Sequence, residues 1–455
     1  MSGSLFDEFE GVSAKQWKQK IQMDLKGADY NDALLWQSPE GIHVKPFYHR
    51  DDAKAPFSTI PGQPDPWRIA QSVFIDDVTI ANQLAIDAIS RGAEAIYFSA
   101  EKEFEPDLLF SEFPFADVTI YFDLLFLAEE FMEKLQQFLT QRDASVHYNV
   151  DLLGNLARNG NWFHNLKRDH MILEKVTSQR PSQKIIGVDT TLYQNAGANT
   201  IQQLAYALAH ANEYLNHFSQ KKQPLPIIFK VAIGSNYFFE IAKLRALRIL
   251  YGVLANEYGA QEECHIIAFP SKRNKTLYDY NLNMLRTTTE CMSAILGGAD
   301  TVCNLPYDGI YHKSNEFGER ISRNQLLVLK AESYFDRVSN AADGSYYIES
   351  LTKEFAEKAL ELFKDIERNG GMLQQLKAGT IQKKIKESAQ KEQVLFDEGT
   401  LVLVGTNKYG NDEDRMKENL ELYPFVKMHP RQTIIEPIIE KRLAESLEKE
   451  RLSHE

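Results

Sequence analysis

Short apolar runs alternate with amphipathic stretches through the middle of this chain. Eight runs of strand length recur between residues 68 and 330, and a stretch with helical spacing follows each of them. A strand followed by a helix, repeated eight times, is the pattern of a (β/α)8 or TIM barrel, whose functional groups lie at the C-terminal ends of the strands. We therefore predict an α/β fold built on such a barrel. The eight runs cover residues 69–75, 95–99, 118–125, 146–153, 185–192, 227–233, 266–269 and 301–305.

The stretches between the runs place their apolar residues on one face. The clearest cover residues 79–90, 127–140 and 237–258. Such a stripe normally faces the protein core. The stripe of the longest stretch consists of Ile241, Leu244, Leu247 and Tyr251. Three cations lie off that stripe: Lys243, Arg245 and Arg248.

An N-terminal arm precedes the predicted barrel. We divide the chain into an arm over residues 1–60 and a barrel over residues 61–340. Ser13 can cap a helix over residues 14–26, and the weak alternation of residues 39–48 predicts a short strand or hairpin. An arm without a core of its own must pack either on the barrel or on a partner.

The region after the barrel, residues 341–455, reads as a helical extension and linker. An amphipathic helix is predicted over residues 351–369, and a second one over residues 372–395 is expected to break near Gly379. The charged amphipathic tail over residues 434–450 predicts a third helix.

Composition and charge narrow the class of protein. Hydrophobic residues make up 43% and charged residues 25% of the 455 residues, as in ordinary soluble proteins. The formal net charge of −13 argues against binding of nucleic acid, because such binding requires a positively charged surface. The sequence has no apolar stretch long enough to span a membrane and no secretory signal at its start. We expect a cytoplasmic protein that binds neither nucleic acid nor a membrane.

Cysteines and histidines give no metal or disulfide signal. Cys264, Cys291 and Cys303 are odd in number and far apart, so we expect reduced, buried thiols. His164 and His170 stand six residues apart, which is not a same-face pairing on a helix. We interpret them as surface or capping histidines, and we expect no metal site.

Four charged residues near the predicted strand ends are candidates for chemistry. Asp123, Asp151 and Asp189 could act as acids or bases there, or could equally cap helices and turns. Lys230 lies inside the sixth run, where a desolvated amine could act as a base or form a Schiff base, although alternation does not say whether it points into the barrel. The nucleotide-binding glycine motifs are absent from the sequence.

Several short motifs, in order along residues 60–410, together resemble the methylmalonyl-CoA mutase family. That family interconverts methylmalonyl-CoA and succinyl-CoA with adenosylcobalamin. The motifs are Pro-Trp-Arg-Ile at 66–69, Gln-Asn-Ala-Gly-Ala at 194–198, Phe-Phe-Glu-Ile-Ala-Lys-Leu-Arg-Ala at 238–246, Arg-Ile-Ser-Arg-Asn-Gln at 320–325, Glu-Ser at 332–333, Asp-Gly-Ser-Tyr-Tyr-Ile-Glu at 343–349, Gly-Gly-Met at 370–372 and Gly-Thr-Asn-Lys-Tyr at 405–409.

The resemblance also implies catalytic positions, and this chain departs from the family's pattern at them. Catalytic members carry a tyrosine shortly after the Pro-Trp segment, where this chain has Ser72. They carry a histidine four residues before the Ala-Gly-Ala segment, where this chain has Leu192, which cannot donate a hydrogen bond to a thioester carbonyl. The Thr-Ser-Gly-Trp motif expected within residues 271–276 is replaced by Lys-Arg-Asn-Lys at residues 272–275.

The family's cobalamin-binding motif, Asp-x-His-x-x-Gly, is also missing from the sequence. The resemblance is therefore to the small, non-catalytic chain of heterodimeric members. It implies no catalytic residue, with Ser72 and Leu192 as degenerate positions, no cofactor-binding residue and no cobalamin domain. It also implies a large catalytic partner chain that holds adenosylcobalamin, with residues 1–48 as its contact. Without that partner the chain could form a homodimer.

Two other hypotheses stay open at this point. The chain could be the barrel of a split acyl-CoA mutase whose cobalamin domain is a separate polypeptide, but Ser72 and Leu192 argue against this. It could also be an independent TIM-barrel enzyme that uses Asp123, Asp151 or Lys230. An open pocket at the strand ends would favour this last hypothesis, and a pocket filled by side chains would disfavour it.

Overall fold

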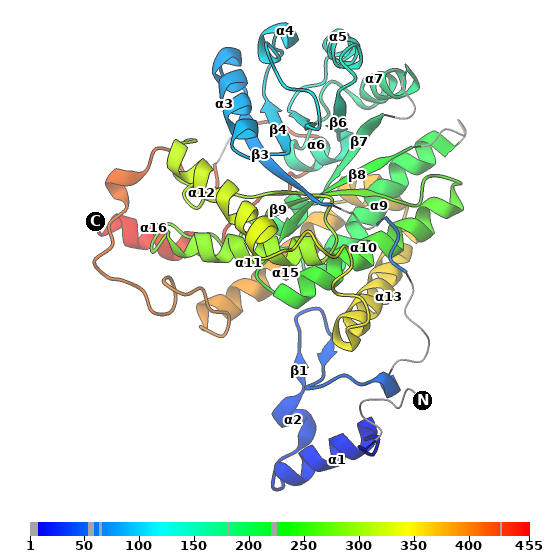
Figure 1. The fold of residues 1–455 in the computed structure, drawn as a ribbon, viewed down its shortest axis with the longest axis vertical. Coiled ribbons are helices and arrows are strands. Elements are labelled where there is room, and N and C mark those ends of the chain that lie inside the picture. Colours follow the sequence, from blue (N-terminus) through cyan, green and yellow to red (C-terminus); the bar gives the residue numbers. More distant parts are fainter. Residues whose placement is uncertain (1–7, 53–58, 63–65, 180–182, 220–224, 428–429) are drawn as a thin grey trace.

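A closed barrel of eight parallel strands forms the centre of the molecule (Figure 1). The computed structural model describes residues 8–52, 59–62, 66–179, 183–219, 225–427 and 430–455. Strand β10 pairs with β3 and closes the barrel, so the predicted α/β fold and all eight predicted strands are confirmed. The strands are β3 (Arg68–Phe74), β4 (Ala95–Ala100), β5 (Thr119–Leu124), β6 (Ser145–Val150), β7 (Lys184–Asp189), β8 (Ile227–Ile233), β9 (His265–Pro270) and β10 (Thr301–Cys303).

Alternation along each strand separates the barrel interior from the helix-facing side. On β3, Ile69 and Val73 join the core between barrel and helices, whereas Ala70 packs inside the barrel. Three of the predicted runs, 146–153, 185–192 and 301–305, were too long by two or three residues, because their last residues leave the sheet. Thus Leu192 lies on the short helix α8 (Thr191–Asn195) and not on strand β7.

Helices surround the barrel as the sequence predicts. The predicted helices over 79–90, 127–140 and 237–258 correspond to α3, α5 and α10. The bounds are α3 (Val78–Ser90), α4 (Pro106–Leu109), α5 (Glu129–Thr140), α6 (Leu152–Asn159), α7 (Leu166–Gln179), α9 (Thr200–Phe218), α10 (Tyr237–Glu257), α11 (Leu282–Leu296), α12 (Glu316–Leu327) and the π-helical turn η3 (Val328–Glu332).

The three cations of helix α10 were expected to lie off the core-facing stripe, but they are buried. Lys243, Arg245 and Arg248 are all at most 2% exposed. Helix α13 (Tyr346–Arg368) packs along α10, and Arg245 pairs there with Asp343 and Glu349. The cations therefore lie in the core because carboxylates neutralise them: Glu240 of the same helix pairs with Lys243, and acidic residues distant in sequence pair with Arg245 and Arg248.

The N-terminal arm projects from the body beside α13 (Figure 1). It contains α1 (Ala14–Asp24), α2 (Tyr30–Leu34), a hairpin of β1 (Trp36–Gln37) and β2 (His43–Val44), and the 3-10 turn η1 (Arg50–Asp52). The predicted helix and its Ser13 cap are confirmed, and a hairpin forms, but its first strand lies before the predicted range 39–48. Helix α1 buries none of its side chains.

The C-terminal region continues with α14 (Gly371–Lys377) and α15 (Thr380–Asp397), and the predicted break falls at Gly379, whose φ is +73°. The 3-10 turn η4 (Lys417–Asn419) follows. The predicted tail helix was wrong over most of its length, residues 434–444, because α16 begins only at Glu445 and ends at Ser453. Residues 430–444 are non-helical, and their backbone binds the barrel loops instead of itself.

The three cysteines are free and buried, as predicted. Among the described residues, no helix is both long and apolar enough to cross a membrane.

Candidate functional site

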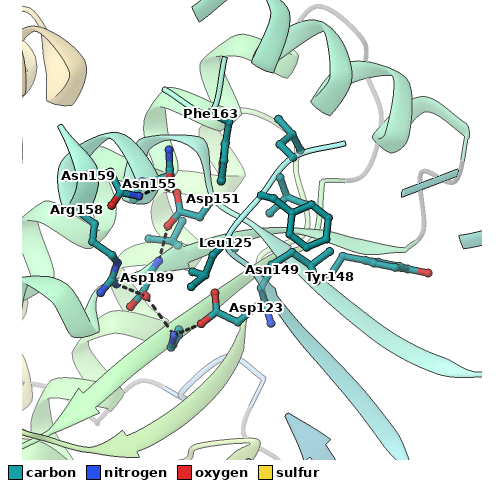
Figure 2. Close-up of a pocket in the computed structure, with 18 of the residues that line it drawn as sticks. Asp123, Leu125, Tyr148, Asn149, Asp151, Asn155, Arg158, Asn159, Phe163 and Asp189 are labelled. Atoms are coloured by element: carbon teal, nitrogen blue, oxygen red, sulfur yellow. Dashed lines mark hydrogen bonds and ion pairs between the residues drawn. The ribbon is translucent and has the colours of Figure 1, made fainter. Parts of the chain in front are cut away.

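The C-terminal ends of β5, β7 and β8 bring three of the four candidate residues together inside the barrel mouth. Nζ of Lys230 donates to Oδ2 of Asp123 at 2.8 Å and lies 3.2 Å from Oδ2 of Asp189. The Tyr97 hydroxyl donates to the same Asp123 oxygen at 2.9 Å. Lys230 therefore points inward, and the dashed lines in Figure 2 show the pairs that hold both aspartates.

The charges of this cluster stabilise one another. Burial opposes ionisation, but the neighbouring carboxylates outweigh it and raise the pKa of Lys230 well above its ordinary value. For the same reason, despite their burial, the pKa of Asp123 and that of Asp189 are both lowered. Lys230 stays protonated, so it is suited neither to abstract a proton nor to attack a carbonyl.

Asp151, the fourth candidate, holds local structure. Its Oδ1 accepts from the Gly154 amide at the start of α6, from the Tyr214 hydroxyl, and lies 2.8 Å from Nε2 of His210. Its Oδ2 accepts from the Asp189 amide at 2.8 Å. With both oxygens occupied, Asp151 is the capping residue that one of the two interpretations predicted.

Arg158, which the sequence analysis did not single out, extends the cluster. Its Nη2 donates to Asp189 at 2.8 Å, and its Nη1 lies 3.6 Å from Oε2 of Glu440. A cavity of about 50 Å³ lies among these side chains and is bordered by Leu125 and Phe163 (Figure 2). The mouth is thus largely filled by paired charges, which disfavours the independent-enzyme hypothesis.

Ser72 and Leu192, the two positions that the resemblance predicts to be degenerate, do not join this cluster. Ser72 lies on β3, in register with Tyr97 of β4, on the inward-facing side of the strand. Leu192 is 1% exposed and packs in the core between barrel and helices. The Leu192 side chain has no donor for a substrate carbonyl, and Ser72 has only a hydroxyl group.

Charged side chains of the segment 271–276 also bind other parts of this chain. Lys275 and Glu290 form an ion pair in which both side chains are 1% exposed. Arg273 pairs with Glu392 of α15 and donates to the backbone carbonyl of Lys441. Lys275 is thus paired within the barrel and Arg273 with the C-terminal region, so neither side chain is available to a ligand.

Below the mouth, the barrel interior is filled. The side chains that pack together there include those of Ala70, Ala95, Tyr97, Ile228, Ile267 and Cys303. At the N-terminal end of the strands, the Tyr121 hydroxyl lies 2.7 Å from both Nε2 of His265 and Oγ1 of Thr301. The ring of His147 packs on that of His265, with 4.3 Å between centroids.

Because of this buried histidine pair, we expect the free energy of unfolding to fall in acid. Burial, helped by the two rings' mutual repulsion and by Lys184 and Arg68, lowers the pKa of His147 well below 6.5, and burial with Lys184, Arg248 and Arg68 does the same for His265. Below pH 6.5 the unfolded chain binds protons that the native state does not, so each histidine should remove about 1.4 kcal/mol of unfolding free energy per pH unit.

Urea unfolding between pH 7 and pH 5 measures this slope. The His147→Phe variant keeps the ring but not the proton site, so its slope should fall by about 1.4 kcal/mol per pH unit. The matched control is His43→Phe, at an exposed position on β2. An unchanged slope in His147→Phe would show that this histidine does not make the free energy of unfolding depend on pH.

His164 and His170 are structural, as interpreted. Nδ1 of His164 lies 3.0 Å from the buried Asp169, and Nδ1 of His170 lies 2.8 Å from the Leu166 carbonyl. Across the part of the chain that the structure describes, no group of three or more histidine, cysteine or acidic side chains could hold a metal ion.

The fold defines a (β/α)8 barrel protein, and paired charged side chains occupy the C-terminal ends of its strands. The family model described as methylmalonyl-CoA mutase matches residues 124–449, more than half of the chain. The chain belongs to the methylmalonyl-CoA mutase family.

Individual relatives agree with this assignment. The chain is 33% identical over 444 residues to the methylmalonyl-CoA mutase small subunit of Porphyromonas gingivalis, covering 90% of this chain and 71% of the relative. It is 28% identical to the methylmalonyl-CoA mutase small subunit of Streptomyces virginiae, with 83% and 67% covered. It is 27% identical to the methylmalonyl-CoA mutase of Cereibacter sphaeroides, with 86% and 64% covered. The chain thus spans about two thirds of the length of the relatives it matches.

The family resemblance implies adenosylcobalamin, and the strand ends do not fit it. The cavity of about 50 Å³ is far smaller than this cofactor. The charged groups around the cavity, Asp123, Asp189, Lys230 and Arg158, are already paired with one another. No reaction step is therefore assigned to cobalamin at this site.

Proposed function

We propose that this chain is the small, non-catalytic subunit of an adenosylcobalamin-dependent methylmalonyl-CoA mutase and that it stabilises a large catalytic chain. The observation that carries the proposal is the internally neutralised cluster of Lys230, Asp123 and Asp189 at the strand ends. A barrel enzyme needs free polar groups at that place. Two relatives bearing the name small subunit support the proposal.

Ser72 and Leu192 add support from the chemistry of the proposed reaction. Interconversion of methylmalonyl-CoA and succinyl-CoA calls for a donor to the thioester carbonyl, and a buried leucine has none. We assign the cofactor to the partner chain, and we place both chains in the cytoplasm.

The arm is the surface that we assign to the partner. Helix α1 leaves Trp17 47% and Met23 76% exposed, and Phe9 before it is 72% exposed. Large apolar side chains on a projecting segment without a core are typical of a protein interface. Burying them against a second chain would stabilise both chains.

The same contacts argue against the two competing hypotheses. An independent enzyme needs a free acid or base, but Asp123 and Lys230 bind each other and Asp151 caps α6. A split mutase barrel needs an acyl-CoA site, but all residues of segment 271–276 except Lys272 are buried, and Arg273 binds the C-terminal region.

The test is turnover by this chain alone. The purified chain, supplied with adenosylcobalamin and methylmalonyl-CoA, should form no succinyl-CoA, with or without an added cobalamin-binding polypeptide. Turnover by the chain alone would refute the proposal, and turnover only with the separate cobalamin polypeptide would support the split-barrel hypothesis.

A further inference from the structure

Glu319 and Arg323 of α12 stand one helical turn apart but do not form an ion pair. An acidic residue four positions before a basic one is the favourable order for such a pair on a helix. Arg323 is nevertheless only 5% exposed and its Nε is buried without an acceptor. In the part of the chain that the structure describes, no carboxylate oxygen lies within 4.0 Å of its guanidinium nitrogens. Two side chains that could neutralise each other are therefore held apart.

Gln71 of β3 bridges the two side chains. Its Nε2 donates to Oε2 of Glu319, and its Oε1 accepts from Nη1 of Arg323 at 3.3 Å. The other carboxyl oxygen of Glu319 is 3.0 Å from the Ser314 hydroxyl, in the loop that joins β10 to α12. A hydroxyl can donate to a carboxylate or accept from a carboxylic acid. This arrangement can therefore hold Glu319 in its protonated form.

The surroundings of Glu319 favour the protonated form up to neutral pH. Burial, assisted by the negative charge of Asp308, raises the pKa of Glu319 to about 7, although the Ser314 hydroxyl and Arg323 act in the opposite direction. Asp308, in the same loop as Ser314, is itself only 2% exposed. The other charged and titratable groups that face the pair are Cys303 of β10 and Asp87 and Arg91 of α3.

We propose that Glu319 and Arg323 form a proton-controlled switch on α12. With a proton on Glu319, Gln71 keeps the two side chains apart, as in this structure. Loss of the proton leaves a partly buried carboxylate beside a guanidinium that has no counter-charge, so the two pair directly and Glu319 leaves Gln71 and Ser314. Because Ser314 belongs to the loop after β10, the exchange detaches this loop from α12 at the C-terminal ends of the strands. These contacts are independent of the proposed function.

Crystal structures of the unsubstituted chain at pH 5.5 and pH 8.5 test the switch directly. At pH 5.5 the Glu319 carboxyl group should remain hydrogen-bonded to Gln71 and Ser314. At pH 8.5 one of its oxygens should lie within about 4 Å of the Arg323 guanidinium, with the bond to Ser314 broken. The same hydrogen bonds at both pH values would overturn the proposal.

Urea unfolding of Glu319→Gln gives a second readout, because glutamine keeps the shape of the acid without its proton. The unfolded chain releases the Glu319 proton near the ordinary pKa of 4.5, but the native state keeps it to about pH 7, so this contribution to stability is lost as the pH rises between these values. The folding equilibrium constant of the unsubstituted chain, divided by that of Glu319→Gln, should therefore fall by up to about tenfold per pH unit between pH 5 and pH 6.5. It should stay constant above pH 8. The division cancels the contribution of the histidine pair.

The matched control is Glu316→Gln, three residues earlier on α12, where the side chain is 81% exposed. Its ratio to the unsubstituted chain should not change with pH. A ratio for Glu319→Gln that is equally flat would overturn the switch, because Glu319 would then titrate alike in the folded and unfolded states. A falling ratio with unchanged contacts at pH 8.5 would also overturn it and leave Glu319 a buried acid. If Glu319→Gln does not fold, the two crystal structures decide, since they need no substitution.

Discussion

Lys230→Met is expected to lower the free energy of unfolding by about 3 kcal/mol, because it leaves two carboxylates in the barrel mouth without their cation. Asp123 and Asp189 are both within 3.2 Å of Nζ of Lys230 and have side chains that are 31% and 15% exposed. Their partial exposure places the effect at the lower end for a broken buried pair. Equilibrium urea unfolding at pH 7 measures it.

Lys175→Met is the control for Lys230→Met. Lys175 also pairs with two carboxylates, Glu129 and Glu133, but its side chain is 46% exposed on the surface. Its loss should cost much less than that of Lys230, because solvent screens a surface ion pair. Equal effects of the two substitutions would mean that the cluster in the mouth is solvated and does not hold the barrel closed.

Gly197→Ala is expected to cost about 3 kcal/mol of unfolding free energy. Gly197 follows α8 with a φ of +100°, where an L-residue is strained. A Cβ at this position would lie 2.5 Å from Cβ of Ala389 on α15 and 2.9 Å from Nη2 of Arg273. Strain and overpacking should therefore add, and thermal or urea unfolding measures the sum.

Gly379→Ala separates those two causes. Gly379 has a φ of +73°, but no described atom lies within 4 Å of where its Cβ would be. This variant should lose only about 1 kcal/mol, from backbone strain alone. A loss in Gly197→Ala no greater than in Gly379→Ala would show that α15 does not pack closely on the barrel loop.

The barrel could be predicted from the sequence because its signal is local. Each strand is a short apolar run and each is followed by amphipathic spacing, and eight repeats leave few alternatives. The break at Gly379 was predictable for the same reason, because glycine tolerates a positive φ.

What the sequence did not predict depends on contacts between distant residues. Lys230 alternates with apolar neighbours on both sides, and only the closed barrel places Asp123 and Asp189 beside it. Arg245 of α10 was expected off the buried face, but Asp343 and Glu349, about a hundred residues later, neutralise it in the core.

Residues 430–444 show the same limit in the candidate site. Their charged, amphipathic sequence predicts a helix, but their amides bind the backbone carbonyls of Ala157, Gly160, Asn195 and Arg273. The roles of Arg158 and Glu440 follow from that packing, since they are 282 residues apart in sequence and 3.6 Å apart in space. By contrast, Ser72 and Leu192 were located by resemblance to the family, and their lack of catalytic function remains part of the proposal.

The most direct test of the proposed function is the size of the assembly that this chain forms with a large methylmalonyl-CoA mutase chain from the same organism. Size-exclusion chromatography with light scattering should give a one-to-one complex of the two chains, whose turnover follows the large chain. Two separate peaks, with this chain a monomer or a homodimer in the presence of the large chain, would contradict the account.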